Sequence, residues 1–462
     1  MNSPVTTVQD FLQLETSLNL WDTQVRGVSL WAALREDVMV TINNLNQDVT
    51  RIKPRPLQVL KPQLWSMHAK TLAFLGLKQR HTYTNLVVQW AEDRIYPHLY
   101  ENIAHPLILE SSLFGRFDRT NAIHPNREVI LHDTIKILER AFGYIIKLKP
   151  EEQRIIVDFS DNVATHYNLP DSARRFEHMV ITHVKRYLYL KPIFERNIIP
   201  TLENKTAFVA IAAYMATKAA MTQILHEADF TVVEAQHGII NRDHIAYTLP
   251  EAVLTELTHP SRQYLPDTLL TFGKFWSDNA QIPGEKIEIG FPHLMNRLGD
   301  LTTANRMKHK HIMFVSQWTI TEQLVKLAIE LAKKLPDYHI VYKLHPIEVN
   351  MPEKIKPLAG IQNIEVVGLK NVHEVIADAE IIVGYNSTVL FETLAFPDRR
   401  IFILENHEMP AETGQFFNTI DELIGYIQDG KSGYPELSPA QVWADDPTTR
   451  INRFLQRQGL TS

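Results

Sequence analysis

Short apolar runs alternate with longer amphipathic segments over the second half of the chain. Runs of about four to six residues have the length of buried strands, whereas apolar residues at every third or fourth position mark one face of a helix. The pattern predicts helices at 321–335, 372–379 and 388–395, and strands at 311–316, 339–343, 364–367, 380–383 and 400–404. Strands that alternate with helices are typical of a doubly wound parallel sheet, so we expect a Rossmann-like domain at 308–440.

The same alternation occurs between residues 201 and 300. Helical spacing covers 215–228, and apolar runs predict strands at 207–214, 230–234, 268–272 and 286–290. The first two runs and the helix between them form one strand–helix–strand unit, whose parallel connection is right-handed by default. The expected fold class is therefore α/β, with two Rossmann-like domains.

Residues 1–200 show mainly helical spacing, as in 28–40 and 128–148. We therefore expect a largely helical N-terminal part of the first domain, followed by its Rossmann-like part at 201–300. Residues 298–310 are polar, which predicts the interdomain linker there. In the C-terminal tail, 441–462, a helix is expected near 448–458 that could pack back on the first half.

Composition narrows the function classes. A chain of 462 residues is too long for one ordinary core, and 45% hydrophobic with 22% charged residues is typical of a globular protein. Cysteine is absent, so thiolate metal sites and cysteine nucleophiles are excluded. The net charge of -6 argues against a general nucleic-acid partner. Without a signal sequence or an apolar run of about 20 residues, we expect a cytoplasmic protein that reaches any membrane-bound substrate as a peripheral partner.

Three groups of candidate functional residues each follow a predicted strand. His345-Pro346 follows the strand at 339–343, and there the imidazole can donate a hydrogen bond to a phosphate while Lys343 adds positive charge. The alternative is a turn that ends the strand, with Pro346 chosen for its fixed φ angle.

The second group is Asn386-Ser387-Thr388, which lies between a buried strand and a helix that carries Glu392. Hydroxyl groups and free N–H groups at a helix N-terminus bind phosphate, and Glu392 could accept hydrogen bonds from ribose hydroxyls. The alternatives are an ordinary N-cap and a solvated helix residue.

The third group is Gln236-His237-Gly238, at the end of a strand of the first domain. A histidine has an ordinary pKa near ~6.5, which suits a general base, so His237 and Glu234 are the candidate catalytic residues. We place Gln236, Gly238 and His244 on the acceptor side. The alternative is a hydrogen-bonded structural histidine.

Several familiar motifs are missing from the chain. Neither a phosphate loop nor GxGxxG occurs, which argues against kinases and nicotinamide enzymes, and GxSxG is also absent. Asp158, Asp161 and His166 are spaced irregularly, so we expect no metal site and no cofactor.

In this order, the three groups resemble the two-domain GT-B glycosyltransferases of bacterial capsule and surface-polysaccharide synthesis. The resemblance covers about 205–405 and includes 233–240, 265–267, 272–276 and 289–292. The His-Pro and Ser-Thr elements are similar to those of sialyltransferases, Kdo transferases and glycerol-phosphate polymerases, which use CMP- or CDP-activated donors. The resemblance implies that His345, Ser387 and Thr388 hold the donor phosphate and that His237, followed by Gly238, acts as base.

Two departures separate this chain from those families. Sialyltransferases carry an acidic pair before the glycine, where this chain has Gln236-His237. The glycerol-phosphate polymerases carry Trp before the histidine and Thr-Pro after the glycine, which are also missing here. The donor sugar of neither family can therefore be transferred to this chain.

The expected function is that of a metal-independent glycosyltransferase. It would move a sugar or a polyol phosphate from a nucleotide-activated donor to a surface-polysaccharide, glycan or lipid-linked glycan acceptor. Two alternatives remain open: a sugar-nucleotide epimerase of the same architecture, and a non-catalytic binding or assembly module.

Overall fold

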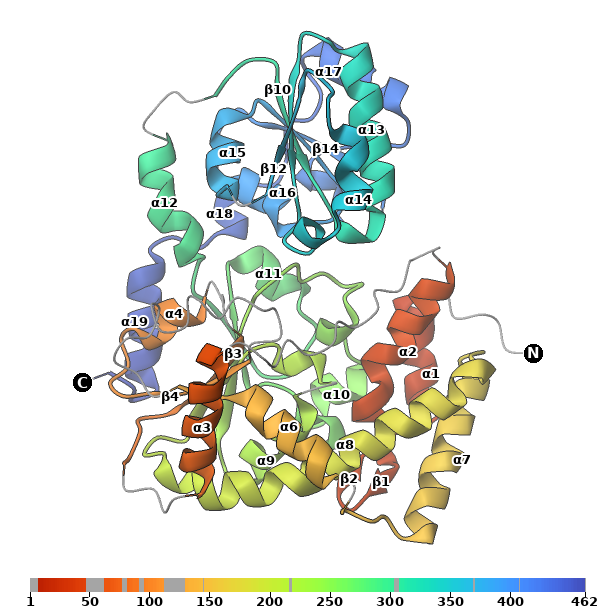
Figure 1. The fold of residues 1–462 in the computed structure, drawn as a ribbon, viewed down its shortest axis with the longest axis vertical. Coiled ribbons are helices and arrows are strands. Elements are labelled where there is room, and N and C mark those ends of the chain that lie inside the picture. Colours follow the sequence, from red (N-terminus) through yellow and green to blue (C-terminus); the bar gives the residue numbers. More distant parts are fainter. Residues whose placement is uncertain are drawn as a thin grey trace.

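The computed structural model describes residues 7–46, 62–76, 81–90, 95–111, 129–143, 145–215, 218–302, 307–368, 370–406 and 408–461. These residues form two α/β domains, the first below the second in Figure 1. Each domain is built on one parallel sheet, as the alternating pattern predicts. No helix within the described ranges has both the length and the apolar character that crossing a membrane requires.

The sheet of the first domain has seven parallel strands in the described chain. Their spatial order is β5 (Val129–Leu131), β4 (Leu107–Ser111), β3 (Leu86–Trp90), β6 (Thr206–Val209), β7 (Thr231–Ala235), β8 (Thr268–Thr271) and β9 (Glu285–Glu288). The order reverses between β3 and β6, so the topological switch point of this domain lies between these two strands.

The region 1–200 is largely helical, but it also supplies three strands of the parallel sheet that the sequence pattern did not predict. β3, β4 and β5 all come from this region, so the first Rossmann-like sheet begins at residue 86 rather than after 200. The reason is that an apolar run as short as β3 has no periodicity that separates a strand from a buried helix.

Helices surround this sheet, and a two-stranded hairpin lies near the N-terminus. The hairpin is β1 (Gln24–Val25) with β2 (Val28–Ser29). The helices are α1 (Val8–Ser17), α2 (Trp31–Asn46), α3 (Pro62–Gly76), α4 (Tyr96–Tyr100), α6 (His132–Phe142), α7 (Pro150–His166), α8 (Ala173–Ile193), α9 (Ala219–Glu227), α10 (Glu251–Thr255) and α11 (Lys274–Asn279).

The sheet of the second domain has six parallel strands in the described chain. Their order is β12 (Ile364–Val367), β11 (His339–Lys343), β10 (His311–Val315), β13 (Ile381–Gly384), β14 (Arg400–Leu404) and β15 (Gln415–Phe417). Five of these strands are predicted by the pattern, and only β15 is not. The helices are α13 (Thr321–Lys334), α14 (Pro352–Ile355), α15 (Val372–Asp378), α16 (Thr388–Thr393) and α17 (Ile420–Asp429).

Both faces of the second sheet are covered at its central strands, which explains why β10, β13 and β14 are almost continuously apolar. Side chains alternate between the faces of a strand. On β10, Ile312 and Phe314 therefore pack in one core with α13 and α17, whereas Met313 and Val315 belong to a core that continues into the first domain. Figure 1 shows α15 and α13 on opposite sides of this sheet.

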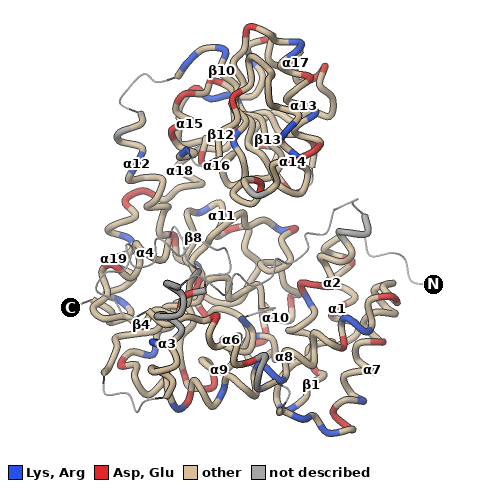
Figure 2. The backbone as a smooth tube through the Cα atoms, in the orientation of Figure 1, with Lys and Arg blue, Asp and Glu red and all other residues tan. Residues whose placement is uncertain are grey.

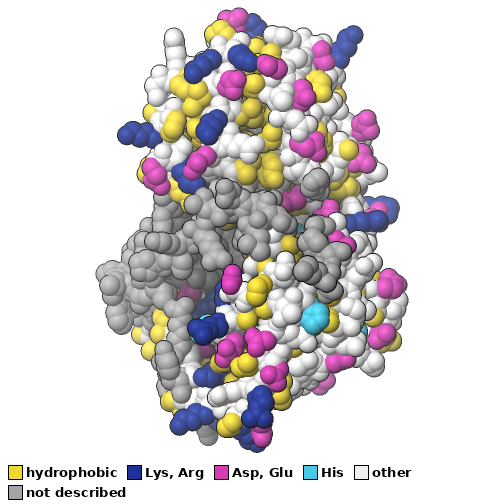
Figure 3. All heavy atoms as spheres, turned by 90° about the vertical axis from the view of Figure 1, so that its right-hand side faces the viewer, with side chains coloured by type: hydrophobic (Ala, Val, Ile, Leu, Met, Phe, Trp, Pro, Cys, Tyr) yellow, Lys and Arg dark blue, Asp and Glu magenta, His cyan; other side chains and the backbone are white. Residues whose placement is uncertain are grey.

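The chain crosses between the domains twice. α12 (Pro292–Thr302) leads to the second domain and occupies the start of the segment predicted as a linker. After α18 (Pro439–Val442), the helix α19 (Pro447–Arg457) returns to the first domain, where the ring of Phe454 lies 6.3 Å from that of Phe208. Charged residues of both signs are distributed over both domains (Figure 2), and the face in Figure 3 mixes them as well.

The returning segment lies against the elements that carry the family resemblance. A Cβ at Gly273 would come within 2.6 Å of the Val442 carbonyl oxygen, so only glycine allows this approach. The indole N–H of Trp276 donates to the same oxygen at 2.9 Å. Trp443 completes an aromatic cluster with Trp276 and Phe391 between the domains. These motif residues therefore hold the two domains together.

Candidate active site

A buried carboxyl group at the end of β7 is the centre of the first candidate cluster. Glu234 is completely buried, and its two oxygens accept hydrogen bonds from the Tyr247 hydroxyl at 2.5 Å and from the Ala213 N–H at 2.7 Å. Burial raises the pKa of Glu234 to about 7, although both hydrogen bonds act in the opposite direction. Glu234 can therefore gain or lose a proton near neutral pH.

The loop after β6 reaches Glu234 through a strained backbone. Ile211 and Met215 have φ angles of 54° and 55°, a conformation that side chains rarely adopt and that costs on the order of 1–3 kcal/mol per residue. Between them, a short 3-10 helix presents the Ala213 N–H to Glu234 and places the ring of Tyr214 5.2 Å from that of His237.

His237 is half-buried and joins the same cluster. Its Nδ1 lies 3.5 Å from the Tyr247 hydroxyl oxygen, which itself donates to Glu234. Burial, helped by His244, lowers the pKa of His237 to about 3. The imidazole is therefore neutral at pH 7, as a proton acceptor must be, but it is a weaker base than an exposed histidine. Through Tyr247, His237 is linked to Glu234, whose pKa is higher than that of His237.

His244 lies beside this group and hydrogen-bonds to Tyr214. The Tyr214 hydroxyl oxygen is 2.9 Å from Nε2 of His244, while Nδ1 accepts from the Ala246 N–H at 3.3 Å. Nδ1 acts as acceptor, so the neutral ring carries its proton on Nε2 and donates it to Tyr214. Burial lowers the pKa of His244 to about 4, which keeps this arrangement neutral.

A second carboxyl group approaches from α2. Glu36 is partly buried, and burial together with Asp37 raises its pKa to about 7. Its charge also raises the pKa of the Tyr214 hydroxyl, after the larger effect of burial. The sequence pattern marks the segment of Glu36 only as an amphipathic helix and that of Tyr214 only as a strand, and it did not indicate Tyr247, so none of the three was predicted as a site residue.

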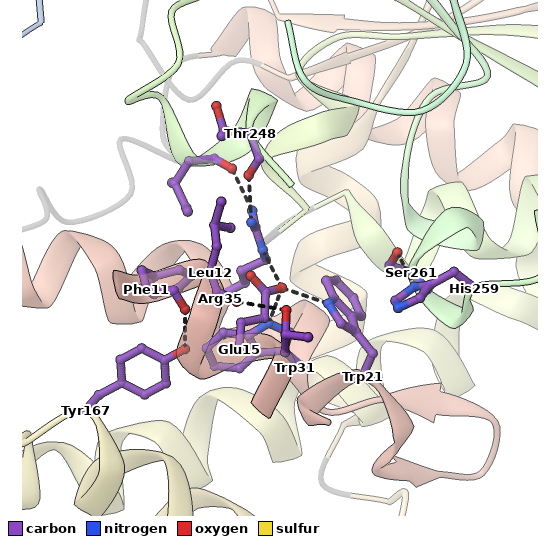
Figure 4. Close-up of polar contacts among 12 residues, drawn as sticks. Phe11, Leu12, Glu15, Trp21, Trp31, Arg35, Tyr167, Thr248, His259 and Ser261 are labelled. Atoms are coloured by element: carbon purple, nitrogen blue, oxygen red, sulfur yellow. Dashed lines mark hydrogen bonds and ion pairs between the residues drawn. The ribbon is translucent and has the colours of Figure 1, made fainter. Parts of the chain in front are cut away.

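A buried ion pair fixes the loop that carries His244 and Tyr247 (Figure 4). Arg35 donates to the carbonyl oxygens of Ile245 at 2.6 Å and Thr248 at 2.8 Å, and its Nε donates to Glu15 at 2.9 Å. The same Glu15 oxygen accepts from the indoles of Trp21 and Trp31. Helices α1 and α2 therefore determine where this loop lies.

The other two predicted acceptor-side residues form the turn after β7. The Gln236 side chain accepts from the Phe272 N–H and donates to the Gly238 carbonyl, both at 2.8 Å. The Gln236 side chain therefore stabilises the turn after β7. Gly238 has open space on the side where a Cβ would lie.

The His-Pro turn forms part of a second cluster, at the carboxyl end of β11. Nδ1 of His345 accepts from the Ile347 N–H at 3.2 Å, so Nε2 carries the proton and is the donor. Burial lowers the pKa of His345, which keeps the ring neutral. Pro346 begins the turn, and the Lys343 ammonium donates to the Gly368 carbonyl at 2.7 Å.

Glu348 anchors this turn, and the sequence pattern did not indicate it. Its completely buried carboxylate accepts from the His345 N–H at 2.8 Å, from Ser316 at 2.8 Å and from Thr321 at 2.6 Å. These three bonds tie the turn after β11 to the end of β10 and the start of α13. The direction of the His345 ring therefore depends on Glu348.

The Asn-Ser-Thr group lies at the switch point of the second sheet, between β10 and β13. The Gln317 side chain donates to both oxygens of Asn386, at 2.8 and 3.0 Å. The Ser387 hydroxyl accepts from the Val389 N–H at 3.3 Å, which makes it the N-cap of α16, and Thr388 is the first residue of that helix.

Glu392 is almost completely buried, not solvated. Its carboxylate lies 2.5 Å from Nε2 of His373, which is also buried. The structure therefore rules out the solvated alternative, while the ribose role of Glu392 stays a prediction.

The two clusters face each other across the domain boundary. Asn241, in the loop after β7, donates to the carbonyl oxygen of Glu408 at 2.6 Å, and the carboxylate of Glu408 accepts from Asn386. The carboxyl ends of both sheets are thus brought to one place, where ligands of such folds bind.

Comparison with solved structures identifies the fold. The structure of MnaA from S. aureus with UDP superimposes with a TM-score of 0.50 at 11% identity, covering 82% of this chain and 98% of that one. UDP-GlcNAc 2-epimerase from Neisseria meningitidis bound to UDP-GlcNAc superimposes with a TM-score of 0.42 at 14% identity, covering 81% of this chain and 100% of that one. Anabaena HepE in complex with UDP and glucose superimposes with a TM-score of 0.43 at 9% identity, covering 81% of this chain and 99% of that one. No protein-family model and no curated protein sequence matches the chain. The chain has the two-domain GT-B fold.

Proposed function

We propose that the protein is a nucleotide-sugar glycosyltransferase whose active site lies between the two facing clusters. The observation that carries this proposal is the chain of contacts from His237 through Tyr247 to Glu234, on the side of the domain boundary opposite His345, Ser387 and Thr388. Transfer from a phosphate-linked donor requires a proton acceptor on one side and hydrogen-bond donors for the leaving phosphate on the other.

The donor nucleotide binds the second domain. Nε2–H of His345 and the hydroxyls of Ser387 and Thr388 donate hydrogen bonds to its phosphate, and Lys343 and Asn386 contribute to the same site. Glu392 accepts hydrogen bonds from the ribose hydroxyls after its contact with His373 is broken. The imidazole and hydroxyl donors are neutral and Lys343 adds positive charge, and together they stabilise the charge that develops on the leaving phosphate. The resemblance of the His-Pro and Ser-Thr elements favours a CMP- or CDP-linked donor. The structure of MnaA, which shares the fold, was determined with UDP, so UDP must be included among the nucleotides tested.

The acceptor binds the first domain. Its hydroxyl oxygen attacks the anomeric carbon, the bond from that carbon to the phosphate oxygen breaks, and the electron pair leaves with the phosphate. Nε2 of His237 takes the acceptor's proton, Nδ1 passes its own proton to the Tyr247 oxygen, and Tyr247 passes its hydroxyl proton to ionised Glu234, so that His237 and Tyr247 end neutral. The relay explains how an imidazole of low pKa can act as base, because the proton comes to rest on a carboxylate whose pKa is near 7.

The test begins with a thermal-shift screen of the protein against CMP, CDP, UDP, GDP and ADP. A ligand that binds only the folded state raises Tm by mass action. We expect one nucleotide to raise Tm, the His345→Ala variant to lose this shift, and His237→Ala to keep it. If His345→Ala responds like the wild type, the assignment of the donor site is wrong.

The second step uses the nucleotide sugars of the selected base with a panel of glycan acceptors. Release of nucleotide should depend on an acceptor and should fall by about two to four orders of magnitude in His237→Ala, the usual contribution of a general base. Full transfer activity in this variant would exclude His237 as the base.

An epimerase is the second candidate, because two carboxyl groups with pKa values near 7, Glu36 and Glu234, approach the same cluster. Removal of a proton from a sugar carbon and its return need such a pair. Incubation of the nucleotide sugar in D2O without acceptor separates the two candidates, because only an epimerase incorporates deuterium into the recovered sugar. If no nucleotide binds at all, the third possibility, a non-catalytic module, is supported.

A further inference from the structure

A groove on the first domain lies beside the loop of His244 and Tyr247. It is formed between α1, the segment 249–254 that contains α10, and Gln281, and its volume is about 520 Å³. Sites for small molecules usually have volumes of about 300–1,000 Å³, so the groove has room for a short chain of sugar units. The described residues that line it belong to neither of the two clusters at the domain boundary.

One wall of the groove is a face of α1 with uncharged polar side chains. The groove-lining residues of this helix include four that are spaced by three and four positions and therefore share one face: Gln9, Leu12, Gln13 and Thr16. The Thr16 hydroxyl donates to the Leu12 carbonyl oxygen at 2.9 Å, so its own oxygen can still accept. The side-chain amides of Gln9 and Gln13 form no hydrogen bond with any group in the described part of the chain.

The opposite wall supplies a third amide. Gln281 is half-buried, and its side-chain amide also lacks a hydrogen-bond partner among the described residues. Its backbone is fixed, because its N–H donates to the Tyr247 carbonyl oxygen at 2.7 Å and its carbonyl accepts from the Leu249 N–H at 3.0 Å. Amides that can both donate and accept therefore line the groove from two sides.

The more deeply buried residues of the groove are apolar. Leu12 and Leu249 are 7% and 2% exposed, whereas the glutamines of α1 are exposed. Pro250 is buried and lines the groove as well. A sugar unit has the matching surface, because its ring carries C–H groups on its faces and hydroxyl groups, which donate and accept, around its edge.

The charge of the lining favours a neutral ligand. Among the described residues that line the groove, Glu251 is the only charged one. A phosphate or carboxylate group in the groove would therefore meet a like charge and no lining cation. Neutral hydroxyl groups suit this set of amides better than an anion does.

The groove is joined to the candidate active site through the loop that follows β7. Tyr247, whose hydroxyl donates to Glu234, holds the backbone of Gln281 with its carbonyl oxygen. The carbonyl oxygen of the next residue, Thr248, accepts from Arg35, and the ion-pair partner of Arg35 is on α1 (Figure 4). One face of α1 thus lines the groove, and another face fixes the loop that carries Tyr247.

We propose that this groove binds a stretch of neutral sugar units of the acceptor, at a distance from the hydroxyl that reacts. The inference rests on the proposed function and deepens it, because it names the acceptor class: a neutral oligosaccharide chain rather than a single or a phosphorylated sugar. Sugar units in the groove hold the acceptor against the loop of Tyr247 while its end reaches His237. The groove therefore sets the preferred length of the acceptor.

The first experiment measures oligosaccharide binding to the full chain by calorimetry and saturation-transfer NMR, without nucleotide. The probes are the neutral trisaccharides maltotriose, isomaltotriose, cellotriose, laminaritriose and chitotriose, with glucose and trigalacturonic acid for comparison. We expect at least one neutral trisaccharide to bind, glucose to bind about tenfold more weakly or less, and trigalacturonic acid not to bind.

Substitution of the amides tests the assignment to the groove. Gln13→Leu and Gln281→Leu should each weaken trisaccharide binding about three- to tenfold, because each removes a hydrogen bond but keeps a side chain of similar size. The double variant should show the product of the two factors. The matched control is Gln456→Leu, which changes an exposed glutamine on α19. Since neither groove amide bonds to the described protein, the Tm of each variant should stay that of the wild type.

Transfer assays connect the groove to the reaction. With the nucleotide sugar selected by the thermal-shift screen, KM should fall as the acceptor is lengthened from one unit to three units of the sugar that binds. The double variant should lose this dependence on length, whereas Gln456→Leu should keep it.

Four results would overturn the inference. They are that no neutral trisaccharide binds, that trigalacturonic acid binds as tightly, that the double variant binds like the control, or that it turns a dimer into a monomer in ultracentrifugation, which would assign the groove to a second copy of the chain. If nucleotide binds and transfer occurs but KM does not depend on acceptor length, only this inference fails. If a trisaccharide binds the groove but no nucleotide binds the protein, the proposed function fails and the glycan site stands.

Discussion

The most direct test of the first cluster replaces Glu234 with glutamine. Glutamine has nearly the same shape and can still accept the hydrogen bond from Tyr247, but it cannot ionise. Its amide nitrogen would oppose the Ala213 N–H, which now donates to the carboxylate at 2.7 Å. That conflict costs the same free energy at every pH, so the pH dependence isolates the ionisation of Glu234.

The magnitude follows from the pKa of Glu234. Burial raises it from 4.5 to about 7, so the folded state holds this proton more tightly than the unfolded state does. The stabilisation by protonation is complete below about pH 4.5 and is lost as the pH rises through 7. At 1.36 kcal/mol per pKa unit, the difference corresponds to about 3 kcal/mol.

The assay is urea unfolding of the wild type and Glu234→Gln at intervals from pH 4.5 to 8, with the exposed residue Glu203 changed to Gln as control. The wild type should lose about 3 kcal/mol relative to Glu234→Gln over this range. Glu36 titrates in the same interval, but it is present in both proteins and cancels in the difference. If the free energies of unfolding of the wild type and Glu234→Gln change equally with pH, the pKa of Glu234 is not raised. Glu234 would then not be the final proton acceptor of the relay.

Three further substitutions test the supports of the two clusters. Arg35→Met leaves the Glu15 carboxylate buried without its ion-pair partner, so urea unfolding should show a loss of about 3–5 kcal/mol. Glu348→Met removes the acceptor of the His345 N–H; thermal shifts should show nucleotide binding weakened by about tenfold, with the fold retained. Gly273→Ala brings a methyl group to 2.6 Å from the Val442 carbonyl oxygen, and calorimetry should show destabilisation of about 1–3 kcal/mol.

Much of the second domain could be predicted because its signals are local. The strands β10 to β14 are apolar runs bounded by polar residues, and the helices between them have their own periodicity. β3, β4 and β5 were missed because their short runs become a sheet only through pairing with distant residues. Leu86, for example, pairs with Ala207.

The candidate residues at strand ends could also be found from the sequence, since the carboxyl ends of parallel strands mark ligand sites wherever the strands are recognised. His237, His345 and Ser387 all lie at such ends. What they contact could not be found in this way. Glu392 illustrates the difference, because its position in a helix left open whether it meets solvent or, as the structure shows, His373.

The sequence by itself therefore determined the alternation of strands and helices and the placement of polar groups at strand ends, because both depend on neighbours along the chain. Only the tertiary structure brought Tyr247 between Glu234 and His237 and placed Glu36 where its charge acts on the Tyr214 hydroxyl. Burial and pairing arise from contacts between residues far apart in the chain. The same contacts move the pKa of Glu234 up and that of His237 down, so the chemistry of the site is a property of the folded molecule.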